Sequence, residues 1–447
     1  MVSRIRARNI GPVREADIRF GDLTIFVGPQ ATGKSIFLQV LKLLVDKASI
    51  HETMRYFGMG QTADASAFFD LYFGEGMASI WTVESCLVLG RAKSQTNLTD
   101  YAHARPGRKG SPEKPEQMFY IPAQRVTSLR DGMTHPFNVY RAGDPFVLRD
   151  FSDKLHWILQ NEIGLDEDVF PRPGRLSAEL REPLEEHIFN KFALRTDTSA
   201  HQRRLVLKSS SGRPLPYLVW SAGQREFVPL LLGLYWLLPP AKSSRRRDFE
   251  SVVIEEPEMG LHPNGIGAVL NFVMELLSRG YRVYLSTHSP HVLDIVWALG
   301  FFQKNNGEKR DVLKLLGLSP TPKTKQIADT ALKSKFRTYY FARDGEVHDI
   351  SRLDPGSEIL AEGGWGGLTE FSGRVGDVVA ESPTARRGHD DLQGGRGGRA
   401  TSGEWRLLSR QAGHGEQTPL SCNLRRSHTI NREHRSRQCT QAAQTQR

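Results

Sequence analysis

The chain has 447 residues, of which 39% are hydrophobic and 25% charged, close to the averages of globular proteins. This length allows one large domain with insertions, or two domains with a core each. The longest apolar runs are far shorter than the roughly 20 residues of a membrane-spanning helix, so we expect no membrane segment. The N-terminus lacks the apolar stretch of a signal peptide, and three cysteines suggest no disulfide framework, so we expect a cytoplasmic protein.

The net charge of +10 is concentrated at the C-terminal end of the chain. Residues 382–447 contain twelve Arg, no Lys and five acidic residues, which gives +7 and leaves +3 for the first 381 residues. The net charge therefore does not indicate a general nucleic-acid-binding surface on the body of the protein, although it is compatible with a local basic patch.

The N-terminal region alternates like β-structure over residues 2–27, and the apolar run Leu23–Val27 predicts a buried central strand. A glycine-rich turn separates this strand from Ile36–Val45, where helical spacing predicts a helix. The irregular pattern of residues 51–116 predicts an insertion that ends in an exposed loop over Arg105–Pro115.

Residues 145–200 predict a helical lobe, with helices at about 147–163 and 176–192, the second of which contains Pro183. A hairpin-like pair follows, Arg204–Lys208 with Tyr217–Trp220. The last clear α/β pattern runs from Phe249 to about Ile350, with strands at Val252–Ile254 and Val283–Leu285.

After about Glu381 the composition changes abruptly to Gly, Arg and other polar residues, which bury too little apolar surface to offset the entropy of ordering. We therefore expect residues 382–447 to be disordered. One interpretation is a frameshift or gene-end fusion near residue 381, since the basic side chains there are all Arg apart from His. The other is an Arg/Gly-rich tail that binds nucleic acid.

The strongest motif is a phosphate-binding loop of the form GxxxxGK[ST], placed between a predicted strand and a predicted helix. Its backbone N–H groups surround phosphates, Lys34 reaches the outer phosphates, and the Ser35 hydroxyl binds Mg²⁺. A chance glycine-rich turn does not account for the strand and the helix on either side. We expect every residue of the loop to contact the nucleotide: Gly28, Pro29, Gln30, Ala31, Thr32, Gly33, Lys34 and Ser35.

Two consecutive carboxylates follow the apolar strand Val252–Ile254. Glu255 is placed to hold the Mg²⁺ shell, and Glu256 to orient or deprotonate an attacking water. Paired acids at a strand end are often solvated turn residues, but their order and spacing after a phosphate loop favour the catalytic interpretation.

Three shorter motifs accompany these two. The sequence Ser221-Ala222-Gly223-Gln224 opens an apolar helix, His288 follows the next strand, and Gln124 lies in Tyr-Ile-Pro-Ala-Gln-Arg at residues 120–125. Alone, Gln124 is an ordinary surface amide and His288 a structural histidine. In this order, however, the set resembles the ABC-type P-loop ATPases, and within them the soluble RecF/SMC/OLD-like group. The resemblance covers residues 3 to about 295, and more weakly to about 380.

The resemblance implies a role for each motif. Residues 221–224 match the signature loop, with Ala222 in place of a glycine, so Ser221, Gly223 and Gln224 are expected to contact ATP. Gln124 matches the Q-loop glutamine, which approaches Mg²⁺ and the water, and His288 the switch histidine. Residues 258–263 match the segment that usually reads Glu-x-x-Leu-His-Pro. The expected catalytic residues are thus Glu256, His288 and Gln124, and the expected Mg²⁺ ligands Ser35, Glu255 and Gln124.

Two positions depart from the pattern of the family. Glu255 stands where the family usually has Asp, and Gln30 stands where Asn is common. Neither difference removes an essential group, because the carboxylate and the amide are both kept.

The resemblance implies an α/β fold with an ABC-type P-loop NTPase sheet, antiparallel N-terminal strands, an inserted loop region and a helical signature lobe. The domains expected on this basis are an ATPase domain at 1–350, its C-terminal extension at 351–381 and the tail at 382–447. The insertion at 51–116 and the lobe at 145–200 belong to the first of these.

The same resemblance implies ATP hydrolysis with Mg²⁺ and an ATP-bridged, head-to-tail homodimer, in which the signature loop of one subunit caps the γ-phosphate bound by the other. Three roles stay open: DNA repair or mobile-element defence with DNA or a partner nuclease, an ATP-gated switch that binds a protein, and a transporter's nucleotide-binding subunit. A fused nuclease of the TOPRIM kind is not expected, since no Asp-x-Asp follows His288.

Overall fold

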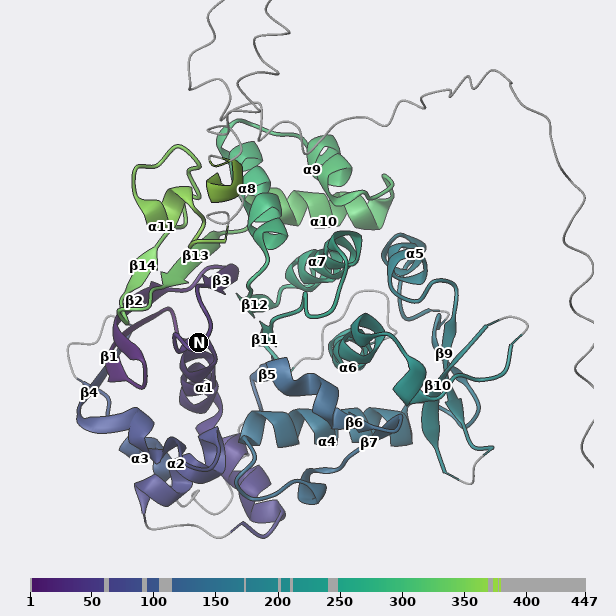
Figure 1. Cartoon of the computed structure of the whole chain (residues 1–447), viewed down its shortest axis with the longest axis horizontal. Helices are drawn as coiled ribbons and strands as arrows, with labels where there is room; N and C mark the ends of the chain where they lie inside the picture. Colours follow the sequence, from purple (N-terminus) through teal and green to yellow (C-terminus); the bar gives the residue numbers. More distant parts are fainter. Residues whose placement is uncertain are drawn as a thin grey trace, which may run out of the picture. The chain divides into compact units, whose positions relative to one another are not determined.

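A six-stranded sheet forms the centre of the protein, in the order β14-β13-β3-β12-β11-β5 (Figure 1). β14 is antiparallel to β13, and the other neighbours pair in parallel. The carboxyl ends of the parallel strands therefore meet at one edge of the sheet. The strands are β3 (Leu23–Val27), β5 (Met118–Ile121), β11 (Ser251–Glu255), β12 (Arg282–Ser286), β13 (Phe336–Phe341) and β14 (Val347–Asp349).

This computed structural model describes residues 2–59, 64–90, 95–103, 115–172, 174–199, 202–209, 212–239, 248–368, 373–376 and 378. The residues up to Gly373 form one compact unit. The predicted tail at 382–447 lies outside the described residues, as does the predicted loop at 105–115 apart from Pro115.

Alternate side chains of the parallel strands pack on opposite faces of the sheet. On one face, Leu23, Ile25 and Val27 belong to a core shared with the helices α4, α6, α7 and α8. On the other face, Phe26 packs with α1 and the N-terminal strands. These runs are apolar throughout because both faces are covered, and this confirms the predicted α/β fold. The helices are α1 (Lys34–Tyr56), α4 (Phe146–Asn161), α6 (Ala222–Leu237), α7 (Pro263–Ser278) and α8 (Pro290–Lys304).

The N-terminal strands form a separate antiparallel sheet in the order β2-β1-β4. Its third strand comes from the region 51–116, so this predicted insertion supplies part of the sheet. The same region buries Phe68, Phe69 and Tyr72 of α2 against α1. The elements are β1 (Arg4–Ile10), β2 (Val13–Arg19), α2 (Ala65–Phe73), η1 (Met77–Ile80), β4 (Trp81–Leu89) and α3 (Thr99–Ala102).

The helical lobe also carries a small antiparallel sheet, β10-β9-β8. Here one prediction was wrong, because β10 (Arg204–Lys208) pairs with β9 (Ala193–Asp197) and not with residues 217–220. Residues Tyr217–Val219 form the 3₁₀ helix η4, and Leu215 forms an isolated bridge with Leu207. The prolines on either side of Leu215 lack the N–H donors that a strand ladder needs. The other elements here are β8 (Asp168–Phe170) and α5 (Ala178–His187).

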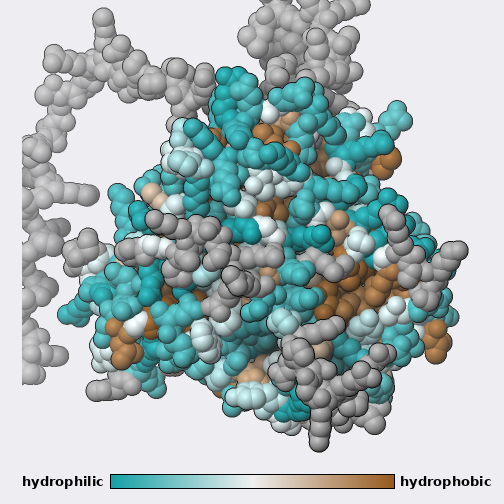
Figure 2. All heavy atoms as spheres, turned by 180° about the vertical axis from the view of Figure 1, so that it is seen from behind, coloured by the Kyte–Doolittle hydropathy of each residue, from teal (hydrophilic) through white to brown (hydrophobic). Residues whose placement is uncertain are grey.

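Short elements and C-terminal helices complete the unit, and the face seen from behind is mainly hydrophilic with small apolar groups (Figure 2). None of the helices within the described ranges is long and apolar enough to cross a membrane. The remaining elements are η2 (Ala123–Ser128), β6 (Leu129–Arg130), β7 (Met133–Thr134), η3 (Phe137–Val139), α9 (Lys309–Leu316), α10 (Pro322–Lys333) and α11 (Leu360–Gly363).

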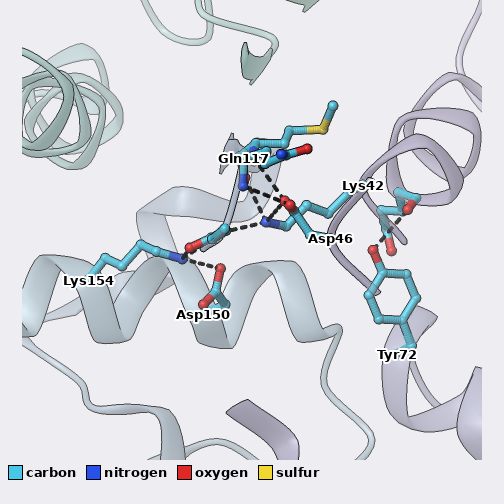
Figure 3. A network of polar contacts seen from close by, with 9 residues as sticks. Lys42, Asp46, Tyr72, Gln117, Asp150 and Lys154 are labelled. Atoms are coloured by element: carbon cyan, nitrogen blue, oxygen red, sulfur yellow. Dashed lines mark hydrogen bonds and ion pairs between the residues drawn. The ribbon is translucent and has the colours of Figure 1, made fainter. Parts of the chain in front are cut away.

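A buried network of charges joins α1, the start of β5 and α4 (Figure 3). Lys42 Nζ donates to Asp46 Oδ2 at 2.7 Å, to the Met118 carbonyl at 2.6 Å and to Glu116. Lys154 of α4 binds Glu116 at 3.0 Å and also Asp150. Since α1 begins in the phosphate loop and β5 ends near Gln124, the network sets the relative position of two parts of the candidate site.

Candidate functional site

The phosphate loop connects β3 to α1, and its backbone conformation depends on glycine. Gly28 has φ +141°, and a Cβ atom there would lie 2.3 Å from the Phe341 carbonyl oxygen of the neighbouring strand. No side chain is tolerated at this distance. Gly33, with φ +92°, directly precedes the first turn of α1. The loop therefore lies against β13 with the N-terminus of α1 open toward the carboxyl edge of the sheet, a geometry suited to phosphate.

Lys34 is buried within this loop. Its Nζ donates to the carbonyl oxygens of Gly28 and Pro29, at 2.8 and 2.7 Å. Burial lowers the pKa of Lys34 to about 8, although the charges of Glu256, Glu255 and Glu258 act to raise it. A partly desolvated ammonium gains more from a phosphate than a fully hydrated one, because less water must be removed. Of the other loop residues, Gln30 and Ala31 are exposed and Thr32 is buried.

Glu255 ends β11 with its carboxylate buried opposite Ser35. Its Oε2 accepts from the N–H of Ala123 at 3.1 Å, while Oε1 has no partner in normal hydrogen-bond geometry among the described residues. Burial raises the pKa of Glu255, although Ser35 and the Ala123 N–H act to lower it. An unsatisfied carboxylate oxygen beside a serine hydroxyl fits a hard cation, so Ser35 and Glu255 could hold Mg²⁺.

No group of three His, Cys, Asp or Glu residues in the described ranges could hold a metal ion by itself.

Glu256 and His288 face each other across the ends of β11 and β12. The Oε1 atom of Glu256 lies 3.4 Å from His288 Nε2, and both side chains are 27% exposed. The contact with His288 lowers the pKa of Glu256, so this carboxylate is ionised at neutral pH. Glu256 also has φ +43°, and its N–H donates to the Ser286 carbonyl at 2.9 Å. A non-glycine residue in this region costs about 1–3 kcal/mol, and such strain is typical of functional positions.

Glu258 has a role in the structure that the sequence interpretation did not assign. Its Oε1 accepts from the His288 N–H at 2.6 Å and from the Thr287 hydroxyl at 2.8 Å, and burial raises its pKa. The carboxylate thus holds the loop that carries the histidine. The sequence did contain a signal for this residue, since an acid recurs two positions after Glu256.

Gln124 lies in η2, directly after the Ala123 N–H that binds Glu255, and its side chain is exposed. The next residue, Arg125, is fully buried and was quoted in the sequence motif without a role. Its guanidinium donates to the carbonyl oxygens of Glu255, Glu256 and Glu226, at 2.7, 2.9 and 3.1 Å. An arginine that touches the backbone of the carboxylate pair could not be recognised from local sequence.

The signature loop begins α6 as a capping box. Ser221 Oγ accepts from the Gln224 N–H at 3.2 Å, and Gln224 Oε1 accepts from the Ser221 N–H at 3.0 Å. Ser221 is exposed, and a Cβ atom on Gly223 would lie 2.6 Å from the Gly260 carbonyl oxygen. The loop therefore packs against the segment after the carboxylates, with its serine facing outward at a helix N-terminus.

One family model matches part of the chain. Residues 147–294 match the family described as "AAA domain, putative AbiEii toxin, Type IV TA system", a stretch that contains the signature loop, the carboxylates and His288. No curated protein matches the sequence closely.

Two of the solved structures that resemble this chain each cover 78% of it. The first is the SMC head domain from Thermotoga maritima, with 11% sequence identity, 97% coverage of that chain and a TM-score of 0.32. The second is an SmcHead bound to the C-winged helix domain of ScpA, with 11% sequence identity, 96% coverage of that chain and a TM-score of 0.34. Likeness of this degree assigns no role to any residue.

The matched stretch begins after the phosphate loop, whose strand β3 lies beside β12 in the same parallel sheet. Loop and matched motifs thus meet at one edge, in the order along the chain that the resemblance requires. Residues 147–294 therefore match the AAA-domain family, and the phosphate loop lies beside this stretch at the same edge of the sheet.

Proposed function

We propose that the protein binds ATP with Mg²⁺ at the carboxyl edge of the central sheet and hydrolyses it. The phosphate loop holds the triphosphate, Ser35 and Glu255 hold the cation together with Gln124, and Glu256 activates the water with His288 beside it. The observation that carries this proposal is the contact between Glu256 and His288, 3.4 Å apart. An ionised carboxylate at this edge is suited to accept a proton from water.

Mg²⁺ supplies charge neutralisation and orients the phosphates, and the protein groups supply the proton acceptor and a fixed geometry. Lys34 adds a positive charge near the outer phosphates. Its lowered pKa indicates that a phosphate will be bound with proton uptake above about pH 8.

Hydrolysis in this scheme is coupled to a head-to-tail homodimer. Ser221 and the N–H of Gly223 stand at the exposed start of α6, and a helix N-terminus favours an anion. We infer that these groups cap the γ-phosphate bound by a second copy, so that ATP closes the dimer and hydrolysis opens it.

The favoured role is DNA repair or mobile-element defence, together with DNA or a partner nuclease. The description of the matched family, a putative toxin of a toxin–antitoxin system, is in keeping with defence. The alternatives are an ATP-gated switch that binds a protein and, less favoured, a transporter subunit. Co-purification with an integral membrane protein would favour the last of these. The cytoplasmic location inferred from the cysteine content stays a prediction.

The test is the variant Glu256→Gln, which removes the base and keeps the size of the side chain. We expect ATP turnover to fall at least about 100-fold, ATP binding to persist, and a dimer to accumulate with ATP in light-scattering chromatography. Glu186→Gln, an exposed glutamate of α5, is the control and should hydrolyse ATP normally. Turnover by Glu256→Gln at the wild-type rate would show that the catalytic assignment is wrong.

A further inference from the structure

Arg125 is a fully buried arginine in contact with three separate parts of the candidate site. It belongs to η2, next to Gln124. Its Nη1 donates to the Glu255 carbonyl, its Nη2 to the Glu256 carbonyl and its Nε to the Glu226 carbonyl. One planar guanidinium therefore joins the Q-loop, the end of β11 and the signature helix α6.

This position is costly for a charged group. Burial lowers the pKa of Arg125, and the only ion pair assigned to it within the described residues is a long contact with Glu226, at 3.8 Å. An arginine stays charged in proteins, so the guanidinium charge is desolvated here. The charges of Glu226, Glu258, Glu256 and Glu255 offset this cost, together with the hydrogen bonds to the carbonyl oxygens. An apolar side chain of similar volume would fill the same space without this cost. The contacts that the guanidinium makes are thus the feature that distinguishes it from a packing residue.

The contact with Glu256 bears directly on catalysis. The backbone of Glu256 is in the left-handed region, at φ +43°, and is held on one side by the Ser286 carbonyl. Arg125 Nη2 holds the other side of the same residue, at its carbonyl oxygen. These two hydrogen bonds determine the direction in which the carboxylate leaves the backbone, and therefore its placement beside His288.

The contact with Glu226 lies one turn into α6, whose first residues form the signature loop. The Glu226 carbonyl moves whenever α6 turns or shifts. Because the same planar guanidinium donates to both carbonyl oxygens, a shift of the Glu226 carbonyl that the guanidinium follows also changes its hydrogen bond to Glu256.

We propose that Arg125 is a positioning residue that couples the signature helix to the catalytic carboxylate within one subunit. The proposal rests on the proposed function, since it assumes that Glu256 acts on water. Arg125 itself touches neither nucleotide nor water in this scheme. Its effect is on the orientation of Glu256 and on the response of that orientation to the state of α6.

Two variants test this role. Arg125→Lys keeps the charge but cannot span three carbonyl oxygens, and Arg125→Met keeps volume without charge. For both we expect kcat for ATP to fall roughly 10- to 100-fold, while KM and the dissociation constant for ATP stay within about twofold. The turnover is measured well below the unfolding temperature and normalised to folded protein.

A matched control is available in Arg149 of α4. It is also buried, and it donates to the Leu71 carbonyl at 2.9 Å, without a hydrogen bond to any motif residue. Arg149→Lys and Arg149→Met should destabilise the fold to a similar degree and leave kcat per folded molecule unchanged.

The results separate the proposal from the function on which it rests. A wild-type protein without ATP turnover refutes the proposed function. A wild-type protein with turnover, together with an equally active Arg125→Lys, overturns only the positioning role. The role is also overturned if Arg125→Lys fails to fold while Arg149→Lys folds, because Arg125 is then a structural residue.

Discussion

Replacement of Lys42 by Met should lower the stability of the protein strongly, because it leaves buried carboxylates without their cation. The Lys42 and Asp46 side chains are each 1% exposed, and Glu116 shares the same ammonium. Burial by itself would lower the pKa of Lys42, but Asp46 and Glu116 raise it above its usual value, so the group is charged. Met keeps most of the volume of the side chain, so the change removes charge without creating a large cavity.

Loss of one partner from a buried ion pair costs about 3–5 kcal/mol. With an unfolding entropy of about 2 cal/mol/K per residue over roughly 370 residues, this corresponds to a decrease in Tm of about 4–7 °C. Scanning calorimetry or denaturant unfolding measures the change. Lys333→Met is a matched control, since Lys333 and Asp329 form an i,i+4 pair with the same 2.7 Å distance, but 74% and 33% exposed. It should show no resolvable shift, because solvent screens exposed pairs. Equal shifts for the two variants would refute the assignment of stability to burial of the network.

Three further predictions concern the site and the tail. Ser221→Arg should give a monomer that binds ATP and hydrolyses it poorly, and mixing it with Lys34→Ala should restore some activity through one hybrid site per dimer; no rescue between two folded variants would contradict shared sites. The affinity for ATP in EDTA should fall with rising pH above about 8, by up to about tenfold per pH unit. The reason is that the buried Lys34 loses its proton in the free protein, whereas in the complex the bound phosphates keep Lys34 protonated. Fluorescent-nucleotide titrations from pH 7 to 9.5 measure this trend, and a flat profile would contradict it; Lys34→Ala should show no such slope. Deletion of residues 382–447 should leave turnover and Tm unchanged and should remove most salt-sensitive, non-specific binding of nucleic acid; a marked loss of stability would show that the tail packs on the body.

Local sequence was sufficient for the parts of the fold that depend on short-range patterns. The apolar run Leu23–Val27 is a strand with the predicted bounds, because a strand covered on both faces must be apolar throughout. The strands predicted at 252–254 and 283–285 are each extended by one residue at both ends. The phosphate loop was recognisable because glycine is required where φ is positive and a neighbouring carbonyl approaches closely. The catalytic roles of Glu256, His288 and Gln124 stay predictions.

These local patterns did not predict which distant segments pair as neighbouring strands. β4 lies in a region whose sequence looked irregular, and it becomes a strand by pairing with β1, more than 70 residues earlier. β10 pairs with β9 rather than with the following segment, because prolines remove the donors that the nearer partner would need. Strand pairing depends on which partner offers a complete ladder and a covered face, and only the packed structure determines that.

The order of motifs along the chain was enough to predict the kind of chemistry, since glycines, Lys34, Ser35 and two carboxylates in this order are typical of proteins that bind and cleave a triphosphate. The contacts that hold the carboxylates in place became visible only in the folded chain. Glu258 binds the N–H of His288, 30 residues away, and Arg125 binds the carbonyl of Glu255, 130 residues away. Each of these contacts joins a side chain to a backbone group, which every residue possesses, so no pattern of side chains indicates the partner. They arise because parallel strands bring distant segments to one edge of the sheet.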